Sequence, residues 1–299
     1  MTSKYKVELL LWAAVLFWAG NYTVGKFGMR DFSPLLFTAL RFIIATPLLF
    51  LLLKHREGGL GFSRPDLPRI IAVGIVGIAI YQTVYIAAVK YASVTNAALG
   101  LGVSPIFTIL LGAAAGQEKP NTPALAGCIA AFAGLFLVIR FSPAYSGLAT
   151  TGLLGDGLAL AAGFLWGLYP ILATPLLKNH SSLWVTSHAS LVGTIILLAC
   201  ALPEVGTFAW QAVSPAGWAS LFYSIGPATV IALVAWNHGV EKIGANQVMI
   251  YMYLITPVAI IIGVLTIGET VSLLQGVGGV ITICGVVLAK QSMSKPTSE

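Results

Sequence analysis

Ten apolar segments of about 20 residues follow one another along this 299-residue chain, and they leave few possible folds. A helix needs about 20 apolar residues to cross a hydrocarbon core of about 30 Å. The connections between the segments are mostly short, so we expect no separate soluble domain. The predicted spans are Val7–Lys26, Ser33–Leu53, Arg69–Val89, Thr95–Ala115, Thr122–Arg140, Gly152–Leu177, Ser182–Leu202, Pro215–Val240, Asn246–Gly268 and Ser272–Lys290.

The composition excludes several other classes of protein. Hydrophobic residues make up 58% of the chain and charged residues only 9%, against roughly a quarter charged in soluble domains. With a mean hydropathy of +0.91, the chain has too little charge to cover a soluble surface and too much apolar surface for a disordered protein. The 16 Lys and Arg residues are scattered singly, which does not fit a nucleic-acid binder. We therefore predict an all-α protein of the lipid bilayer.

The distribution of Lys and Arg predicts how the chain is oriented. With the N-terminus inside, the cytoplasmic face carries eleven basic residues and the other face four, while Arg41 lies within a span. Basic residues are enriched in cytoplasmic loops. We therefore expect a multi-pass protein of the cytoplasmic (inner) membrane with both termini in the cytoplasm.

The two halves of the chain resemble each other at an offset near 150 residues. The matching pairs are Trp18 and Trp166, Pro105 and Pro257, Glu118 and Glu269, Gly127 and Gly278, and Gly134 and Gly285. We predict a first five-helix repeat at residues 1–145 and a second at 146–299. Because five is odd, the second repeat would be inverted, as in many secondary transporters whose substrate site lies between the repeats. The alternative is a duplication that merely packs ten helices.

Several motifs resemble one family of transporters. They are Phe17-Trp18-Ala19-Gly20-Asn21-Tyr22, Ser33-Pro34, Ala39-Leu40-Arg41-Phe42, Ala97 to Pro105 with its partner Gly244 to Pro257, and the Gly-Glu pair at Glu269. Together they resemble the EamA family of the drug/metabolite transporter superfamily, most closely its YddG-type exporters of aromatic and other neutral amino acids. The resemblance implies export by alternating access around a central cavity. The first half departs from the Gly-Glu pattern and reads Gly116-Gln117-Glu118.

Aromatic and amide side chains are the best candidates to line a substrate cavity. A site for a zwitterion or a neutral organic molecule needs apolar walls and a few polar groups. The alternative is that such residues anchor the helices at the membrane interface. The candidates are Trp18, Asn21, Tyr22, Tyr81, Gln82, Tyr85, Trp166, Tyr169, His188, Trp236, Asn237, Tyr251 and Tyr253.

Arg41 is the basic residue that lies well inside a predicted span. An intramembrane charge is costly and indicates function by default. The arginine could hold a substrate carboxylate, but in the resembling family it belongs to the fold signature. We therefore interpret Arg41 as a structural charge.

Proton coupling has few candidate groups in this sequence. No Asp or Glu falls at mid-depth of a span, so we expect facilitated export that is not coupled to protons. If coupling exists, His188 is the first group to consider, because histidine titrates near neutral pH.

Two prolines at matching positions could allow movement. Pro105 and Pro257 lie within spans 4 and 9 and lack the N–H that a helix interior needs. We predict hinges at both, and the alternative is a passive kink satisfied by neighbouring helices.

Enzymatic and cofactor-binding functions find no support in the motifs. Asp156 has no second carboxylate with which to form an aspartyl protease pair. Cys128, Cys200 and Cys284 form no CxxC pair, so we expect neither metal nor cofactor. We predict a monomeric exporter of amino acids or similar metabolites. The alternatives are a drug or nucleoside exporter on the same fold, with proton antiport in some forms, and a membrane sensor or structural subunit that transports nothing.

Overall fold

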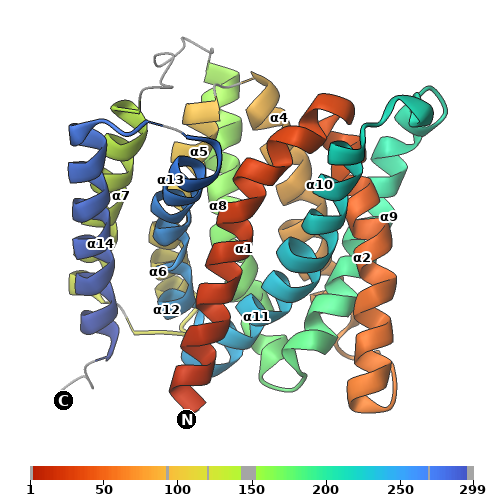
Figure 1. Cartoon of the computed structure of the whole chain (residues 1–299). Helices are drawn as coiled ribbons and strands as arrows, with labels where there is room; N and C mark the ends of the chain where they lie inside the picture. Colours follow the sequence, from red (N-terminus) through yellow and green to blue (C-terminus); the bar gives the residue numbers. More distant parts are fainter. Residues whose placement is uncertain (1–2, 92–93, 120, 143–152, 269, 295–299) are drawn as a thin grey trace. The chain divides into compact units, whose positions relative to one another are not determined.

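The structure is a computed structural model that describes residues 3–91, 94–119, 121–142, 153–268 and 270–294. All regular structure in these residues is helical, as predicted (Figure 1). The chain divides into two compact units, Met1–Ile86 with Leu172–Lys242 and Ala87–Ile171 with Ile243–Glu299. Each unit therefore combines helices from both halves of the sequence.

The first unit contains two long helix pairs, in which α1 packs on α10 and α2 packs on α9. Helices α4 and α8 each contribute residues to both units. The elements are α1 (Ser3–Asp31), α2 (Pro34–Glu57), α3 (Leu67–Gly74), η1 (Ile75–Ile80), α4 (Tyr81–Tyr91), the end of α8 (Leu153–Leu177), α9 (Ser182–Val205), η2 (Trp210–Ala212), α10 (Pro215–Ile225), η3 (Gly226–Ile231) and α11 (Ala232–Ile243).

Serine side chains fix where three of these helices begin. Ser33, Ser181 and Ser214 each accept a hydrogen bond from the backbone N–H three residues later, which satisfies one donor that the first helical turn leaves unpaired. Asp31, the last residue of α1, accepts hydrogen bonds from the backbone N–H of Ser214 at 3.0 Å and from its hydroxyl at 2.5 Å. The end of α1 is thereby tied to the start of α10.

Two π-helical segments widen equivalent spans, and the sequence analysis did not predict them. Segments η1 and η3 begin 151 residues apart, the offset of the internal repeat. In η3 the N–H of Ala232 bonds to the carbonyls of Pro227 and Thr229 rather than to Ala228. Such wide turns inside α-helices are frequent at functional sites. Here they lead directly into the helices that carry Tyr81, Tyr85, Trp236 and Asn237.

The second unit contains α5 (Val94–Gly102), α6 (Ser104–Ala114), α7 (Thr122–Arg140), most of α8, α12 (Ala245–Met249), α13 (Met252–Ile267) and α14 (Leu273–Ser294). Pro105 lies in the first turn of α6, just after a break at Val103, where its missing N–H costs no hydrogen bond. Pro257 differs, because α13 runs through it and the break in that span lies earlier, at Ile250 and Tyr251.

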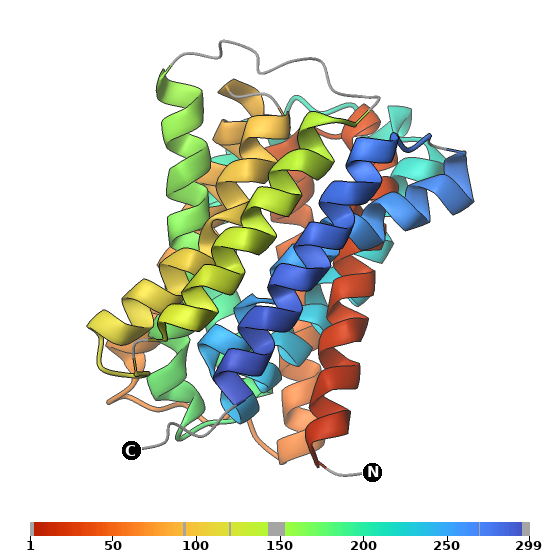
Figure 2. The same ribbon diagram turned by 90° about the vertical axis from the view of Figure 1, so that its left-hand side faces the viewer.

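Helices α7 and α14 pack side by side along a seam of small residues (Figure 2). A Cβ atom added to Gly127 would lie 2.8 Å from the Cα of Ala289, and one added to Gly285 would lie 2.8 Å from the Cα of Ala131. Gly134 meets Thr282 and Gly278 meets Val138 in the same way. As residue numbers rise along α7 they fall equally along α14, so the helices are antiparallel. Moving both residues of a contact by the repeat offset gives another contact of the seam. The contact of Gly127 with Ala289 corresponds to that of Gly278 with Val138, and the contact of Gly285 with Ala131 corresponds to that of Gly134 with Thr282.

The described residues do not show all ten predicted spans as helices of spanning length. Among the described residues, eight helices are long and apolar enough to cross a membrane, and a ninth span is a pair, Tyr5–Asn21 and Thr23–Asp31, bent by 43°. The fourth predicted span, Thr95–Ala115, corresponds to the shorter apolar stretch Ala98–Ala114. Its helical structure is interrupted at Val103, between α5 and α6.

Candidate functional site

The first unit brings Trp18 of α1 against Trp236 of α11. Their ring centroids lie 4.9 Å apart, and Trp236 is fully buried. The indole N–H of Trp18 donates a hydrogen bond of 2.8 Å to the carbonyl of Ala228. In a regular α-helix that carbonyl would accept from the N–H of Ala232, which η3 directs elsewhere. Trp18 therefore donates a hydrogen bond to the Ala228 carbonyl, which the wide turn of η3 deprives of its usual donor.

Both candidate asparagines of this unit make polar contacts between helices. The hydroxyl of Ser224 donates to Asn21 Oδ1 at 2.6 Å, and Asn237 Nδ2 donates to the hydroxyl of Thr186 at 2.8 Å. Asn237 is fully buried. These contacts join α1 to α10 and α11 to α9. The side chain of Tyr22 lies outside the described part of the structure.

Tyr81 and Tyr85 of α4 form a second aromatic pair in the first unit. Their rings stack with centroids 6.0 Å apart, and both lie close enough to Arg41 of α2 for electrostatic interaction with its guanidinium group. Gln82, between them in sequence, is half-buried. The structure thus places the two tyrosines beside the arginine that the sequence analysis treated separately.

In the second unit, Trp166 and Tyr169 of α8 stack almost in parallel. Their centroids are 5.5 Å apart and their planes differ by 7°. The Trp166 indole N–H points to the sulfur of Met252 at 3.2 Å. Both aromatic side chains are buried. The sequence analysis did not identify Met252, because a methionine in an apolar run gives no signal.

The remaining tyrosines of the second unit differ in their polar contacts. The ammonium group of Lys290 donates to the hydroxyl of Tyr251 at 3.0 Å. Tyr253 is 1% exposed, and its hydroxyl has no hydrogen-bond partner among the described residues. Lys290 was assigned only to the cytoplasmic end of the last span, so its contact with Tyr251 was not foreseen.

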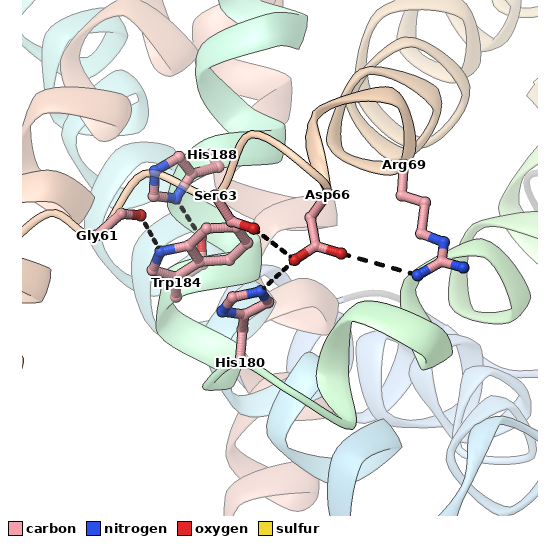
Figure 3. Close-up of polar contacts among 7 residues, drawn as sticks. All are labelled: Gly61, Ser63, Asp66, Arg69, His180, Trp184 and His188. Atoms are coloured by element: carbon pink, nitrogen blue, oxygen red, sulfur yellow. Dashed lines mark hydrogen bonds and ion pairs between the residues drawn. The ribbon is translucent and has the colours of Figure 1, made fainter.

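His188 lies in a stack of rings on α9 (Figure 3). Its Nδ1 atom is 2.9 Å from the carbonyl of Trp184 and must donate to it, which assigns the proton to Nδ1. The His188 ring is 4.1 Å from Trp184 and 5.1 Å from Phe50, and Trp184 in turn stacks on His180 at 3.8 Å. His188 is therefore held by packing and by its own helix.

A polar cluster outside the spans joins the α2–α3 connection to the start of α9 (Figure 3). Asp66 lies 2.8 Å from Nε2 of His180, accepts from the hydroxyl of Ser63 at 2.7 Å and lies 3.7 Å from Arg69. The indole N–H of Trp184 donates to the carbonyl of Gly61 at 2.5 Å. The sequence analysis found neither Asp66 nor His180, because 114 residues separate them.

These contacts make stability depend on pH in a predictable direction. Hydrogen bonds from His180 and Ser63 hold the pKa of Asp66 below its usual value. A carboxyl whose pKa is lowered in the folded state stabilises the fold above its unfolded pKa of about 3.9, and this contribution is lost as pH falls through the lowered value. We expect Asp66→Asn to lower the melting temperature of the detergent-solubilised protein by a few degrees at neutral pH, the scale of an exposed charged contact.

Melting curves from pH 7 down to pH 3 provide the check. The difference between wild type and Asp66→Asn should close as pH falls below about 4. Glu299→Gln removes the same charge from the last residue of the sequence and serves as the control for net charge. A difference that stays constant down to pH 3 would contradict the role assigned to the ionised carboxylate.

A second carboxylate outside the spans lies at the end of α6. Glu118 accepts from the backbone N–H of Asn246 at 3.3 Å, at the start of α12. Burial raises the pKa of Glu118, although the N–H groups of Asn246 and Ala245 oppose this effect. Gly244, which precedes α12, has a φ of +85°, and a Cβ atom there would lie 3.0 Å from Glu118 Oε1. Glycine at this position therefore lets the carboxylate approach the helix start.

Comparison with known proteins identifies the family. The model of the EamA-like transporter family matches twice, at residues 5–140 and 153–290. An "Uncharacterized transporter" of Archaeoglobus fulgidus is 29% identical, over 96% of this chain and 98% of that protein. A "Probable terminal-alkyne amino-acid exporter" of Streptantibioticus cattleyicolor is 28% identical, over 95% of this chain and 94% of the exporter.

One solved structure has a fold similar to that of this chain. A protein crystal structure superposes with a TM-score of 0.81 at 19% identity, over 96% of this chain and 97% of the other. The double family match agrees with the two-repeat fold, and the relatives carry the names of transporters. The chain therefore belongs to the EamA-like transporter family and is a multi-pass membrane transporter.

Proposed function

We propose that this protein exports amino acids, aromatic and other neutral ones among them, across the cytoplasmic membrane by alternating access. The observation that carries the proposal is the likeness, over nearly the whole of both chains, to a relative named as an amino-acid exporter. The aromatic pairs Trp18–Trp236, Tyr81–Tyr85 and Trp166–Tyr169, in which Trp18 and Tyr85 are half-buried and the other four rings buried, supply apolar surface with a few polar groups, the composition that such a ligand requires.

We further propose that export follows the substrate gradient without proton coupling. A proton relay through the membrane needs titratable groups along the path. His188, the first candidate for such a relay, donates a hydrogen bond from its Nδ1–H to the Trp184 carbonyl and lies in a stack of rings. This arrangement favours a structural role for His188.

The arrangement in the membrane is part of the proposal. The repeats would comprise residues 1–145 and 146–299, both termini would lie in the cytoplasm, and the protein would act as a monomer without catalytic activity. The antiparallel packing of α7 on α14 supports the inverted relation between the repeats. Pro105 would act as a hinge directly after the break at Val103, and Pro257 would act as one inside α13, which begins after the break at Ile250 and Tyr251.

Efflux from preloaded proteoliposomes at symmetric pH tests the function directly. The panel contains labelled phenylalanine, leucine and alanine, with uridine and tetraphenylphosphonium as comparators. We expect saturable release of the amino acids without a pH gradient. Release that begins only when a proton gradient is imposed would overturn the uncoupled mechanism and make His188→Gln the next variant.

The comparators separate the other functions. Release of uridine or tetraphenylphosphonium alone would indicate a nucleoside or drug exporter on the same fold. Binding of an amino acid with no release of any compound would indicate a sensor. Either result would contradict the proposed amino-acid export.

A further inference from the structure

The guanidinium group of Arg41 has no counter-ion within the part of the chain that the structure describes. No carboxylate there lies within ion-pair distance of it. Its Nε atom is buried without a hydrogen-bond partner. Its described neighbour is the ring of Phe42, the next residue on α2, with the guanidinium carbon 4.9 Å from the ring centroid. Among the described residues, this permanent charge thus has aromatic neighbours and no anionic partner.

Such an arrangement is costly unless something else completes it. Charged side chains within a membrane span almost always pair with another charge or with backbone carbonyls, and those that do not mark ligand or ion pathways. An interaction with an aromatic ring offsets only part of the free energy that desolvating an ion costs. The expected partner of Arg41 is therefore an anion that the described part of the chain does not provide.

The depth of Arg41 matches that of the tyrosine pair. Helix α2 begins at Pro34, so Arg41 lies about 10 Å along the axis from that end at 1.5 Å per residue. Helix α4 ends at Tyr91 and runs the opposite way through the predicted membrane, which places Tyr85 about 9 Å and Tyr81 about 15 Å from its end. Both tyrosines lie near the guanidinium group. The charge is therefore placed in the neighbourhood of two stacked aromatic rings.

We infer that Arg41 binds the carboxylate of the transported molecule, with Tyr81 and Tyr85 beside it to contact the apolar remainder. A planar guanidinium group matches a carboxylate with two parallel hydrogen bonds. The inference rests on the proposed function and narrows it to substrates that carry a free carboxylate. Neutral nucleosides and lipophilic cations lack the group that this site would bind. Arg41 then acts in substrate binding rather than as a structural charge.

The test compares free acids with their primary amides. Phenylalanine and leucine, each with its amide, compete for efflux of the labelled amino acid from wild-type proteoliposomes. At a pH below the pKa of its amino group, the amide keeps the ammonium group and the side chain but lacks the negative charge, so the competition is measured there. We expect each amide to compete at least about 10-fold more weakly than its acid, the effect of losing a charge-assisted hydrogen bond. Equal competition by acid and amide would overturn the inference, while efflux of the amino acids would leave the proposed function standing.

Variants of Arg41 supply the second measurement. Arg41→Gln should weaken competition by the acids about 10-fold or more and leave the weak competition by the amides unchanged, and Arg41→Lys should fall between Gln and wild type. Arg30→Gln removes a cation from the exposed end of α1 and is the matched control. Equal losses for acid and amide in a folded Arg41→Gln protein would overturn the inference in favour of a structural role. Absence of amino-acid efflux from wild type would instead contradict the proposed function itself.

Discussion

Replacing Gly285 with leucine should separate α7 from α14 and destabilise the protein by about 3 kcal/mol, the upper end of the usual cost of overpacking a core. A Cβ atom at this position would lie 2.8 Å from the Cα of Ala131 and 2.7 Å from the carbonyl oxygen of Gly127. Both obstacles are backbone atoms, so no side-chain rotation relieves the clash. The helices must move apart and lose the close packing that small residues permit in membranes.

Gly276 on the same helix provides a matched control. It is exposed, and nothing lies within 4 Å of a Cβ atom built there. Gly276→Leu adds the same side chain to α14 without a clash. Size-exclusion chromatography and thermal melting in detergent should show loss of monodisperse protein for Gly285→Leu and near wild-type behaviour for Gly276→Leu. Equal behaviour of the two variants would mean that the seam does not determine stability.

The second large effect is expected at Trp18. Trp18→Phe keeps an aromatic ring facing Trp236 but removes the donor that satisfies the Ala228 carbonyl. An unsatisfied carbonyl in an apolar environment costs about 1–3 kcal/mol. Because the regular donor, the N–H of Ala232, bonds to Pro227 and Thr229, no backbone group of η3 compensates without rewinding the turn.

Trp218→Phe is the control, since the Trp218 ring also packs against an aromatic ring, that of Phe32, without a hydrogen bond from its indole N–H to the described residues. Thermal melting should show a loss of stability for Trp18→Phe that Trp218→Phe lacks. Adding Pro227→Ala to Trp18→Phe restores a backbone N–H to η3 and should recover part of the loss. A double variant as unstable as the sum of both single changes would refute the link between the indole and the wide turn.

The helical class of the elements and most of the spans could be predicted from the sequence because they depend on local apolar length. The repeat was also visible, and all four glycines of the pairs Gly127/Gly278 and Gly134/Gly285 prove to lie in the α7–α14 seam. Helix irregularities were harder to predict. Pro227 marks η3, but η1 contains no proline and gives no local signal. At Pro257 the proline predicted a disturbance, yet the break lies at Ile250 and Tyr251, where tertiary packing decides.

Residue types were a good guide to candidate residues and a poor one to their partners. Aromatic and amide side chains were identifiable, whereas the contacts of Trp166 with Met252 and of Asp66 with His180 depend on helices far apart in the sequence. Arg41 shows the same limit. Its position in a span was visible, but the absence of a described counter-ion became visible only in three dimensions.

The seam between α7 and α14 bears on how such a chain could have arisen. Each contact exchanges its partners between the halves, as in an isologous interface between identical subunits. A surface of this kind is complementary to itself, so the two helices need not belong to one polypeptide. An ancestral five-helix protein, inserted into the membrane in both orientations, could have closed the same seam with a second copy of itself before gene fusion joined the two.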